Sequence, residues 1–460
     1  MRVIALLFAA LAPVAAWAQS TAFVHVNVVP MDSERVLRDQ TVLVKDGRIE
    51  AVGAALPAPA GYRVVDGHAT AWLSPGLADM HTHSETRNDL ALYLANGVTT
   101  LLNMGGARAN LVDSIVPAVA RGTLPGPHVY ASLMVDGTPD YNGLQVKTPA
   151  QARAVVDLAA ANGYDFIKVY VGLAPDVFSA LAEAGRAQGL PLVGHGVTAV
   201  RLESQLAQGQ VLVAHLEEFF YTYFTPPGVQ ETDTPPDEAR IPEAVALVKR
   251  HGAAVIADLV TYHAIASQLG HPEVLRAILS APQTAYVAQA DVQAWRRSNY
   301  GGKSARLEVK LAFLRKLTKA LADGGVELMS GTDAPTIPGV APGYSLHDNL
   351  EELESSHLSR YQTLATATSA PGAFIARTKG GVPFGQVAAG YRADLVLSEQ
   401  NPLDSLSTLR APLGVMAEGR WRDQSALAEL LAGVRGSYRD LSRDAVPATA
   451  KRRGKQPMPR

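Results

Sequence analysis

Short apolar runs alternate with amphipathic stretches through the middle of the chain, and this alternation predicts its fold. The amphipathic stretches, for example residues 151–162 and 177–188, are rich in Ala, Leu, Glu and Arg and are typical of helices. Strands that alternate with helices form parallel βαβ units, and eight such units predict an α/β fold with a closed (β/α)8 barrel. The runs expected to form the strands are residues 76–83, 98–104, 128–134, 165–171, 190–195, 211–216, 253–260 and 326–332.

The same alternation is compatible with an open, doubly wound parallel sheet. Such sheets commonly carry a glycine-rich phosphate-binding turn after their first strand. Here the first strand ends in His81-Thr82-His83, with no glycine-rich fingerprint behind it. The barrel is therefore the favoured prediction.

Both ends of the chain show a different pattern, made of short strands and turns. Two β-rich ends that bracket a different middle predict one small, discontinuous β-sandwich domain. Its expected parts are residues 19–74 and 381–435, and the barrel is expected at residues 75–380. A long connection at about residues 261–325 is either a lid over the active-site face or a packing insertion.

The two termini predict segments outside the folded domains. Arg2 precedes an apolar run that ends in small residues, which indicates a secretory signal peptide over residues 1–18 and an exported protein, periplasmic or secreted. The alternative is a buried N-terminal helix. Residues 436–460 end in the basic string KRRGKQPMPR and are expected to form a disordered tail.

Composition narrows the classes of partner and site. The net charge of −2 indicates no nucleic acid or membrane surface as partner, and leaves a small-molecule substrate and a homo-oligomer as options. The absence of cysteine excludes disulfides, thiolate zinc sites and a cysteine nucleophile. Any metal ion must be held by imidazole, carboxylate or an equivalent group.

Six polar side chains stand at the ends of the predicted strands. In a barrel of this type chemistry is located at the carboxyl ends of the strands. Each of the six, taken alone, could be a hydrogen-bonded core residue or a helix cap, but their common placement favours one site. They are His81, His83, Lys168, His195, His215 and Asp333.

Lys168 is the member that a simple metal site does not explain. It follows Phe166 and Ile167 in a strand bound for the interior, where an unpaired ammonium is costly. A neutral lysine amine reacts with carbon dioxide to give a carbamate, which is equivalent to a carboxylate and can bridge two divalent cations.

These residues resemble the ligand set of the amidohydrolase superfamily of metal-dependent hydrolases. The strings SLHDNLEEL, ATSAPGAFIA and AAGYRADLVLSEQNPL resemble its imidazolonepropionase-related branch, which includes Xaa-Pro dipeptidases. The resemblance implies two divalent metal ions, with Zn²⁺ favoured by the ligand types. It assigns His81, His83 and Asp333 to one ion, His195 and His215 to the other, and carboxylated Lys168 to both.

The resemblance also implies the reaction, which is hydrolysis of a C–N amide bond in a dipeptide or N-acyl amino acid by metal-activated water. Asp333 is the expected general base and then acid, and Lys168 the expected bridge. Tyr170, Tyr221 and Tyr223 are candidate substrate contacts. His347 is a candidate for substrate contact or for packing, and Asn349 stands where many relatives have a glutamate.

Two other functions remain open. One is a mononuclear deaminase or cyclic-amidine hydrolase similar to imidazolonepropionase, which would leave Lys168 without a bridging role. The other is a non-catalytic, metal-stabilised binding protein, which would leave Asp333 without a role as a base.

Overall fold

The computed structural model describes residues 20–140, 143–226, 229 and 231–443. The predicted signal peptide and the basic end of the tail lie outside the described residues. Within these ranges, the helices are all too short or too polar to cross a bilayer.

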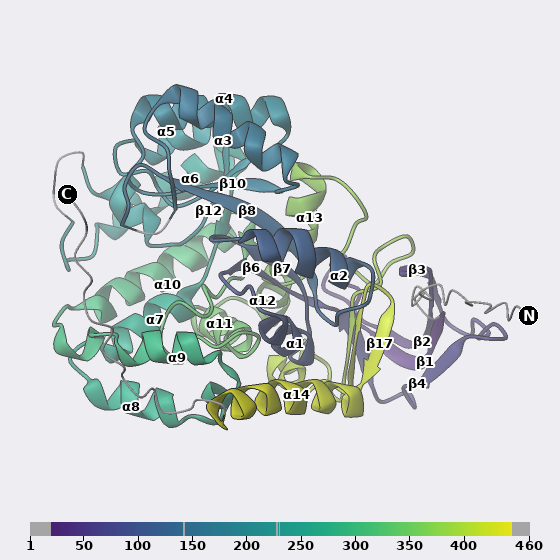
Figure 1. The fold of residues 1–460 in the computed structure, drawn as a ribbon. Helices are drawn as coiled ribbons and strands as arrows, with labels where there is room; N and C mark the ends of the chain where they lie inside the picture. Colours follow the sequence, from purple (N-terminus) through teal and green to yellow (C-terminus); the bar gives the residue numbers. More distant parts are fainter. Residues whose placement is uncertain (1–19, 141–142, 227–228, 230, 444–460) are drawn as a thin grey trace, which may run out of the picture.

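The first structural unit is a sheet built from both ends of the chain, as predicted. It is one eight-stranded sheet in the order β17-β16-β15-β5-β1-β2-β3, with β4 also paired to β1, so the two halves of the expected sandwich are joined by the antiparallel pairing of β5 with β15. Figure 1 shows its N-terminal strands on the side of the molecule farthest from helices α7 to α10. Its strands are β1 (Thr21–Val28), β2 (Leu37–Lys45), β3 (Arg48–Gly53), β4 (Arg63–Asp66), β5 (Trp72–Pro75), β15 (Leu395–Ser398), β16 (Gly414–Ala417) and β17 (Arg420–Asp423).

The second unit is the predicted barrel, and its fold is confirmed. Eight parallel strands follow one another in sequence order, and a short strand, β9 (Leu144–Gln145), pairs at the edge of β8. All eight are composed mainly of apolar or β-branched residues and are largely buried, as expected for a parallel sheet covered on its outer face. They are β6 (Leu77–Thr82), β7 (Val98–Asn103), β8 (His128–Asp136), β10 (Phe166–Val169), β11 (Leu192–Gly194), β12 (Gln210–Val213), β13 (Ala254–Ile256) and β14 (Leu328–Met329).

The barrel closes between its first and last strands. The backbone N–H of Asp333 donates to His81 O at 2.8 Å, and that of His83 donates to Ala334 O at 2.8 Å. Inside this seam the Thr332 hydroxyl donates to the Asp79 carboxylate at 2.6 Å. Burial raises the pKa of Asp79 to about 8, against the opposing effect of this hydrogen bond. The seam therefore brings the two ends of the barrel sequence together.

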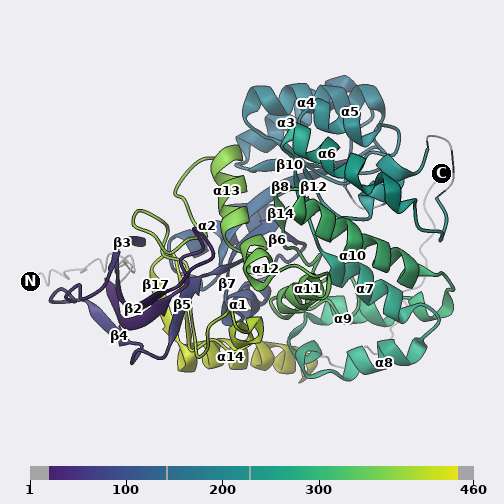
Figure 2. The same ribbon diagram turned by 180° about the vertical axis from the view of Figure 1, so that it is seen from behind.

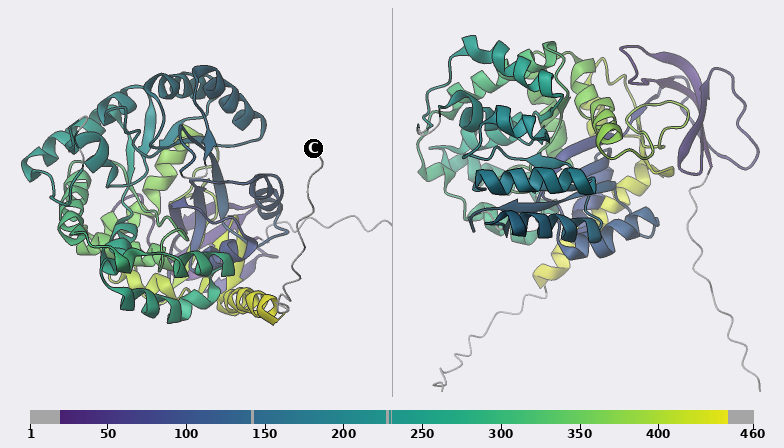
Figure 3. Two further views of the ribbon diagram at one scale, coloured as in Figure 1. Left: turned by 60° about the vertical axis from the view of Figure 1, so that its left-hand side comes forward. Right: turned by 90° about the horizontal axis from the view of Figure 1, so that it is seen from above.

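The helices surround the barrel, as the left-hand view of Figure 3 shows. The segment at residues 261–325 is helical rather than a loop, and α8 and α9 are its inserted part. The helices are α1 (Arg87–Ala95), α2 (Val116–Ala120), α3 (Pro149–Ala161), α4 (Pro175–Gln188), α5 (Leu202–Ala207), α6 (Ile241–His251), α7 (Leu259–Gln268), α8 (Pro272–Ser280), α9 (Gln289–Arg296), α10 (Leu307–Asp323), α11 (Tyr344–Ser355), α12 (Arg360–Thr366), α13 (Ser369–Thr378) and α14 (Gln424–Arg443).

Several predicted boundaries differ from the structure, and two of the differences have a clear structural cause. The strand expected at residues 253–260 ends at Ile256, because the chain turns at Asp258 and begins α7 at Leu259. Residues 436–443, assigned to the disordered tail, belong to α14, which packs against α1 (Figure 2).

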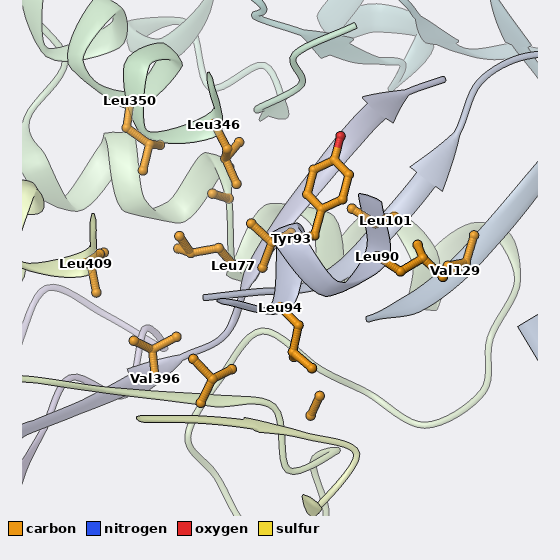
Figure 4. Packing of buried hydrophobic residues seen from close by; sticks show 14 of the residues in the cluster. Leu77, Leu90, Tyr93, Leu94, Leu101, Val129, Leu346, Leu350, Val396 and Leu409 are labelled. Carbon is orange, nitrogen blue, oxygen red and sulfur yellow. The ribbon is translucent and has the colours of Figure 1, made fainter. Parts of the chain in front are cut away.

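A shared apolar core joins the barrel to the sheet. Figure 4 shows Leu90 of α1 beside Leu101 and Val129 of the barrel strands, in the same cluster as Val396 of β15 and Leu346 of α11. All are buried, so separating the two units would expose a continuous apolar surface. The cluster includes Leu77, Leu90, Tyr93, Leu94, Leu101, Leu346, Leu350, Val396 and Leu409.

Candidate metal centre

The six predicted strand-end side chains meet at one end of the barrel. Lys168 Nζ lies 3.3 Å from His81 Nε2. Asp333 Oδ1 lies 3.3 Å from His81 Nε2 and 3.0 Å from His83 Nε2. The ring centroid of His215 lies 4.3 Å from that of His81 and 4.6 Å from that of His195. The structure therefore places all six around one small volume.

Each of three imidazoles is oriented by an acceptor at Nδ1. His81 Nδ1 lies 3.1 Å from Ala214 O, and His195 Nδ1 lies 2.5 Å from Glu218 Oε1. His215 Nδ1 lies 2.5 Å from Asp258 Oδ2. When Nδ1 donates to an oxygen, Nε2 is free to bind a cation, and this arrangement is typical of histidine metal ligands.

Sequence reasoning missed Glu218 and Asp258. Glu218 lies three residues after His215 in HLEE, and Asp258 interrupts the apolar run of residues 253–260, so neither ends a predicted strand as the predicted ligands do. Both carboxylates are almost fully buried. Burial raises the pKa of Glu218 to about 7, although His215 opposes this shift.

The histidines respond differently to burial. Burial lowers the pKa of His81 and His195, and Lys168 and the neighbouring imidazoles lower it further, so both rings are neutral. Burial also acts to lower the pKa of His215, but the carboxylates of Asp258 and Glu217 outweigh it and raise the pKa to about 10.

Lys168 is completely buried on β10. Burial lowers its pKa to about 8, although Asp333, Glu218 and Asp258 act in the opposite direction. Part of the population therefore carries a neutral amine near neutral pH, which is the form that reacts with carbon dioxide.

Asp333 is held in a conformation that few residues adopt. Its φ angle is +59°, in the left-handed region that aspartate tolerates better than most side chains. Thr336 donates its hydroxyl to Asp333 Oδ2 at 2.6 Å. Burial acts to raise the pKa of Asp333, but His83, His215 and Lys168 outweigh it and hold the pKa well below its usual range. The carboxylate is therefore ionised.

Two glycines make room for the imidazoles. A Cβ on Gly105 would lie 2.8 Å from Cε1 of His83, and a Cβ on Gly331 would lie 2.7 Å from Cβ of His81. Either contact is closer than side chains allow, so both positions require glycine for the ligands to converge.

The donor set fits divalent cations. One ligand atom from each of His81, His215 and Asp333 lies within 4.8 Å of the others. Neutral imidazole and carboxylate are the ligands that Zn²⁺ takes in proteins that offer no thiolate. The remaining three predicted ligands surround the same volume, so the set is large enough for two ions.

A cavity of about 490 Å³ opens onto this centre. His83, His195, His215 and Asp333 line it, whereas His81 is completely buried. The predicted substrate contact Tyr170 also lines the cavity, with its ring centroid 4.0 Å from that of His195.

The other predicted substrate contacts lie elsewhere. Tyr221 and Tyr223 are in a helical turn, Phe220–Phe224, and neither is among the described residues that line the cavity. The Tyr223 ring lies against Arg240 at 5.2 Å. His347 is buried between α11 and α1, with Nε2 2.9 Å from Asn96 O, which is the packing role. Tyr221 and Tyr223 were predicted from residue type and nearness in sequence to His215, and the fold directs them away from the cavity.

The sequence predicts no role for Asn349, which is completely buried. Its side-chain Nδ2 donates to Ala257 O at 2.9 Å, and its Oδ1 accepts from the N–H of Val260 at 3.2 Å. The amide thus holds the backbone on both sides of Asp258.

The sequence is similar to known proteins over short segments, and no family model matches it. A 96-residue segment is 33% identical to an imidazolonepropionase of Cupriavidus taiwanensis, covering 19% of this chain and 23% of that protein. A 194-residue segment is 30% identical to adenine deaminase 2 of Bradyrhizobium sp. (strain ORS 278), covering 37% of this chain and 31% of that protein. The chain therefore matches less than a third of the length of either relative.

Solved structures share the fold over most of the chain. A bottromycin amidohydrolase superimposes with a TM-score of 0.71 at 24% identity, covering 91% of this chain and 90% of that chain. A Xaa-Pro dipeptidase with methionine bound in its active site superimposes with a TM-score of 0.66 at 15% identity, covering 88% of this chain and 100% of that chain.

Proposed function

We propose that the chain belongs to the amidohydrolase superfamily and is a metal-dependent hydrolase that cleaves a carbon–nitrogen bond. The short segments similar to imidazolonepropionase and adenine deaminase, together with the shared fold, support this proposal. The observation that carries the proposal is the convergence of four imidazoles, one buried lysine and one ionised aspartate, with three of the imidazoles held at Nδ1. The proposed substrate is a small amide, of dipeptide or N-acyl amino acid type.

In this proposal the centre holds two divalent cations, with Zn²⁺ favoured. His81, His83 and Asp333 would hold one, and His195 and His215 the other. Bound cations would lower the pKa of a water molecule and polarise the scissile carbonyl. The Nζ atom of Lys168 would add to the carbon of CO₂ and lose a proton, which forms a carbamate and removes the cost of a buried ammonium.

Asp333 would carry the proton in the reaction. Its carboxylate lines the cavity and is ionised, so it can accept a proton from water. The Thr336 hydroxyl holds Oδ2, and the imidazoles lie at Oδ1. The Asp333 carboxylate can then deliver that proton to the leaving amine. Water is the nucleophile, so hydrolysis needs no covalent enzyme intermediate.

A mononuclear deaminase or cyclic-amidine hydrolase is the second candidate. The similarity to imidazolonepropionase and adenine deaminase segments favours it. The two candidates differ at Lys168, because a one-metal centre needs no bridging carboxylate.

The test combines a metal count with the variant Lys168→Ala. We expect about two zinc equivalents per chain, turnover of members of a dipeptide and N-acyl amino acid library, and a fall in kcat/KM of at least about 100-fold in the variant. Acetate or propionate should restore part of the activity, because a short carboxylate can occupy the place of the carbamate.

Lys310→Ala is the matched control. Lys310 is the other almost fully buried lysine among the described residues, but it lies on α10 away from the cavity. Short acids should not rescue whatever activity this variant loses. One zinc equivalent, together with unchanged activity in Lys168→Ala, would contradict the two-metal proposal and favour the second candidate.

A further inference from the structure

A second cavity extends from the metal centre. It has a volume of about 680 Å³ and shares four lining residues with the cavity at the metal centre, namely His83, Glu85, Arg108 and Thr336. A substrate whose amide lies at the metal centre can therefore extend one end into this second cavity.

The far part of the second cavity carries carboxylates from two helices. Asp89 belongs to α1 and Asp291 to α9, and both residues line this cavity. Glu85 and Arg108 line both cavities and form an ion pair, with Arg108 Nε 2.9 Å from Glu85 Oε2, and the exposed Arg108 guanidinium also acts on Asp291. The remaining cation of the lining is Arg87, whose side chain is exposed at the start of α1.

Asp89 has an oxygen that the protein does not satisfy. Its residue is 2% exposed, and its Oδ2 accepts from the N–H of Thr86 at 3.1 Å in the capping box of α1. Its Oδ1 is buried and has no hydrogen-bond partner among the described residues. Burial raises the pKa of Asp89 to about 6, and it also raises the pKa of Asp291. A donor from a ligand would relieve this unsatisfied acceptor.

The wall that carries Asp291 is fixed to the metal centre. Trp295 of α9 is 1% exposed and donates Nε1–H to Pro335 O at 2.8 Å. Pro335 lies two residues after Asp333, so the spacing between the Asp291 carboxylate and the centre is set by packing. This segment of the insertion therefore forms a wall of the site.

We propose that the second cavity selects a cationic end of the substrate, so that the substrate class is an amide bearing an ammonium or guanidinium group, as in a peptide with a basic residue. The proposal rests on the proposed function for the position of the amide. Asp291 and Asp89 supply the two carboxylates that receive the cation.

The test uses pairs of dipeptides that differ in one charge. Ala-Lys is compared with Ala-norleucine, and Lys-Ala with norleucine-Ala, because norleucine keeps the side-chain length without the ammonium. For the zinc-loaded enzyme we expect kcat/KM of one lysine peptide to exceed that of its partner by at least about tenfold. Asp291→Asn should remove most of that difference. Asp323→Asn, on an exposed face of α10, should keep it.

A parallel titration separates this inference from the proposed function. Calorimetry follows binding of Nα-acetyllysine and Nα-acetylnorleucine to the zinc-loaded protein and to Asp291→Asn. Equal kcat/KM within both dipeptide pairs would overturn the cationic preference while leaving the hydrolase intact. If no peptide is cleaved, tighter binding of Nα-acetyllysine that is lost in Asp291→Asn would support the cation site and reject the proposed reaction. Equal or absent binding of the two acids would then overturn the inference.

Discussion

The imidazoles of the metal centre owe their orientation to acceptors behind them. Ala214 O, Glu218 and Asp258 each hold one Nδ1 atom, which leaves Nε2 directed at the centre. Of the two contacts to carboxylates, the one between His215 and Asp258 is the more deeply buried, with side chains 4% and 1% exposed. Metal affinity should therefore depend on residues that bind no metal.

Asp258→Asn tests this dependence. The amide keeps the size of the side chain but loses the charge that fixes the His215 tautomer. We expect the affinity for zinc to fall about 10- to 100-fold, as measured by competition with a chromogenic chelator. Asp165→Asn is the control, because Asp165 is a largely buried carboxylate that accepts from the N–H of Ala131 and is not part of the metal centre. Equal losses in both variants would attribute the effect to general destabilisation.

Sequence reasoning found the ligands more readily than their supports. A polar residue at the end of an apolar run can be recognised from the sequence alone, and this pattern predicted His81, Lys168 and Asp333. The pairing of His215 with Asp258 spans 43 residues and exists only after β12 and β13 lie side by side. Tyr223 is near His215 in sequence, but its ring lies against Arg240, because nearness along the chain does not fix the direction of a side chain.

At the scale of elements, the packing of α11 on α1 has a pH-dependent component. His347 is buried in this contact, and burial lowers its pKa to about 4, against the opposing effect of its hydrogen bond to Asn96 O. In the unfolded chain a histidine has a pKa near 6.5. Between these values the unfolded state binds a proton that the folded state excludes, so the free energy of unfolding falls as pH drops from about 6.5 to about 4.

His347→Gln should remove this component. The amide can still donate to Asn96 O but does not titrate. The wild type should lose about 3 kcal/mol more than the variant on going from pH 7.5 to pH 4, measured by urea unfolding. An exposed histidine, His271 before α8, serves as control in His271→Gln. Parallel pH profiles for wild type and His347→Gln would contradict the assignment.

The ends of a strand were predictable where an uninterrupted apolar run defines the strand. They were not predictable where a polar residue interrupts the run. The strands that became β6, β7 and β8 follow their apolar runs closely. The run that contains β13 continues past Asp258 into α7, and apolarity alone does not separate a buried strand from the buried start of a helix. The choice between lid and packing insertion also needed the contact of Trp295 with Pro335, which connects distant parts of the sequence.

At the scale of the whole molecule, Arg392 links the sheet to the barrel. It is 7% exposed, its Nε lies 2.5 Å from Asp394 Oδ2, and its Nη2 donates to Thr100 Oγ1 of β7. Burial acts to lower the pKa of Arg392, but Asp394 outweighs it and raises the pKa. The cation is therefore kept charged in an interface that would otherwise exclude it.

Arg392→Met should weaken this link strongly. Removing one partner leaves the Asp394 carboxylate buried without its cation, which costs about 3–5 kcal/mol in the free energy of unfolding. Chemical unfolding followed by calorimetry and fluorescence measures the change. The control Arg63→Met breaks a partly exposed pair with Asp423 and should cost less than about 1 kcal/mol. Similar losses in both variants would show that the sheet and the barrel do not depend on this contact.

The seam between β6 and β14 makes the metal centre a product of late folding. Asp79 and Thr332 are 253 residues apart in sequence, and His81 and Asp333 lie directly beyond them. Closing a loop of this length is entropically costly, and its cost is offset only once the strands between the two ends are paired. During synthesis, His81 and His83 therefore leave the ribosome long before their carboxylate partner, Asp333. A chain that stops short of β14 would have histidines but no centre, so tight metal uptake would report that the barrel has closed.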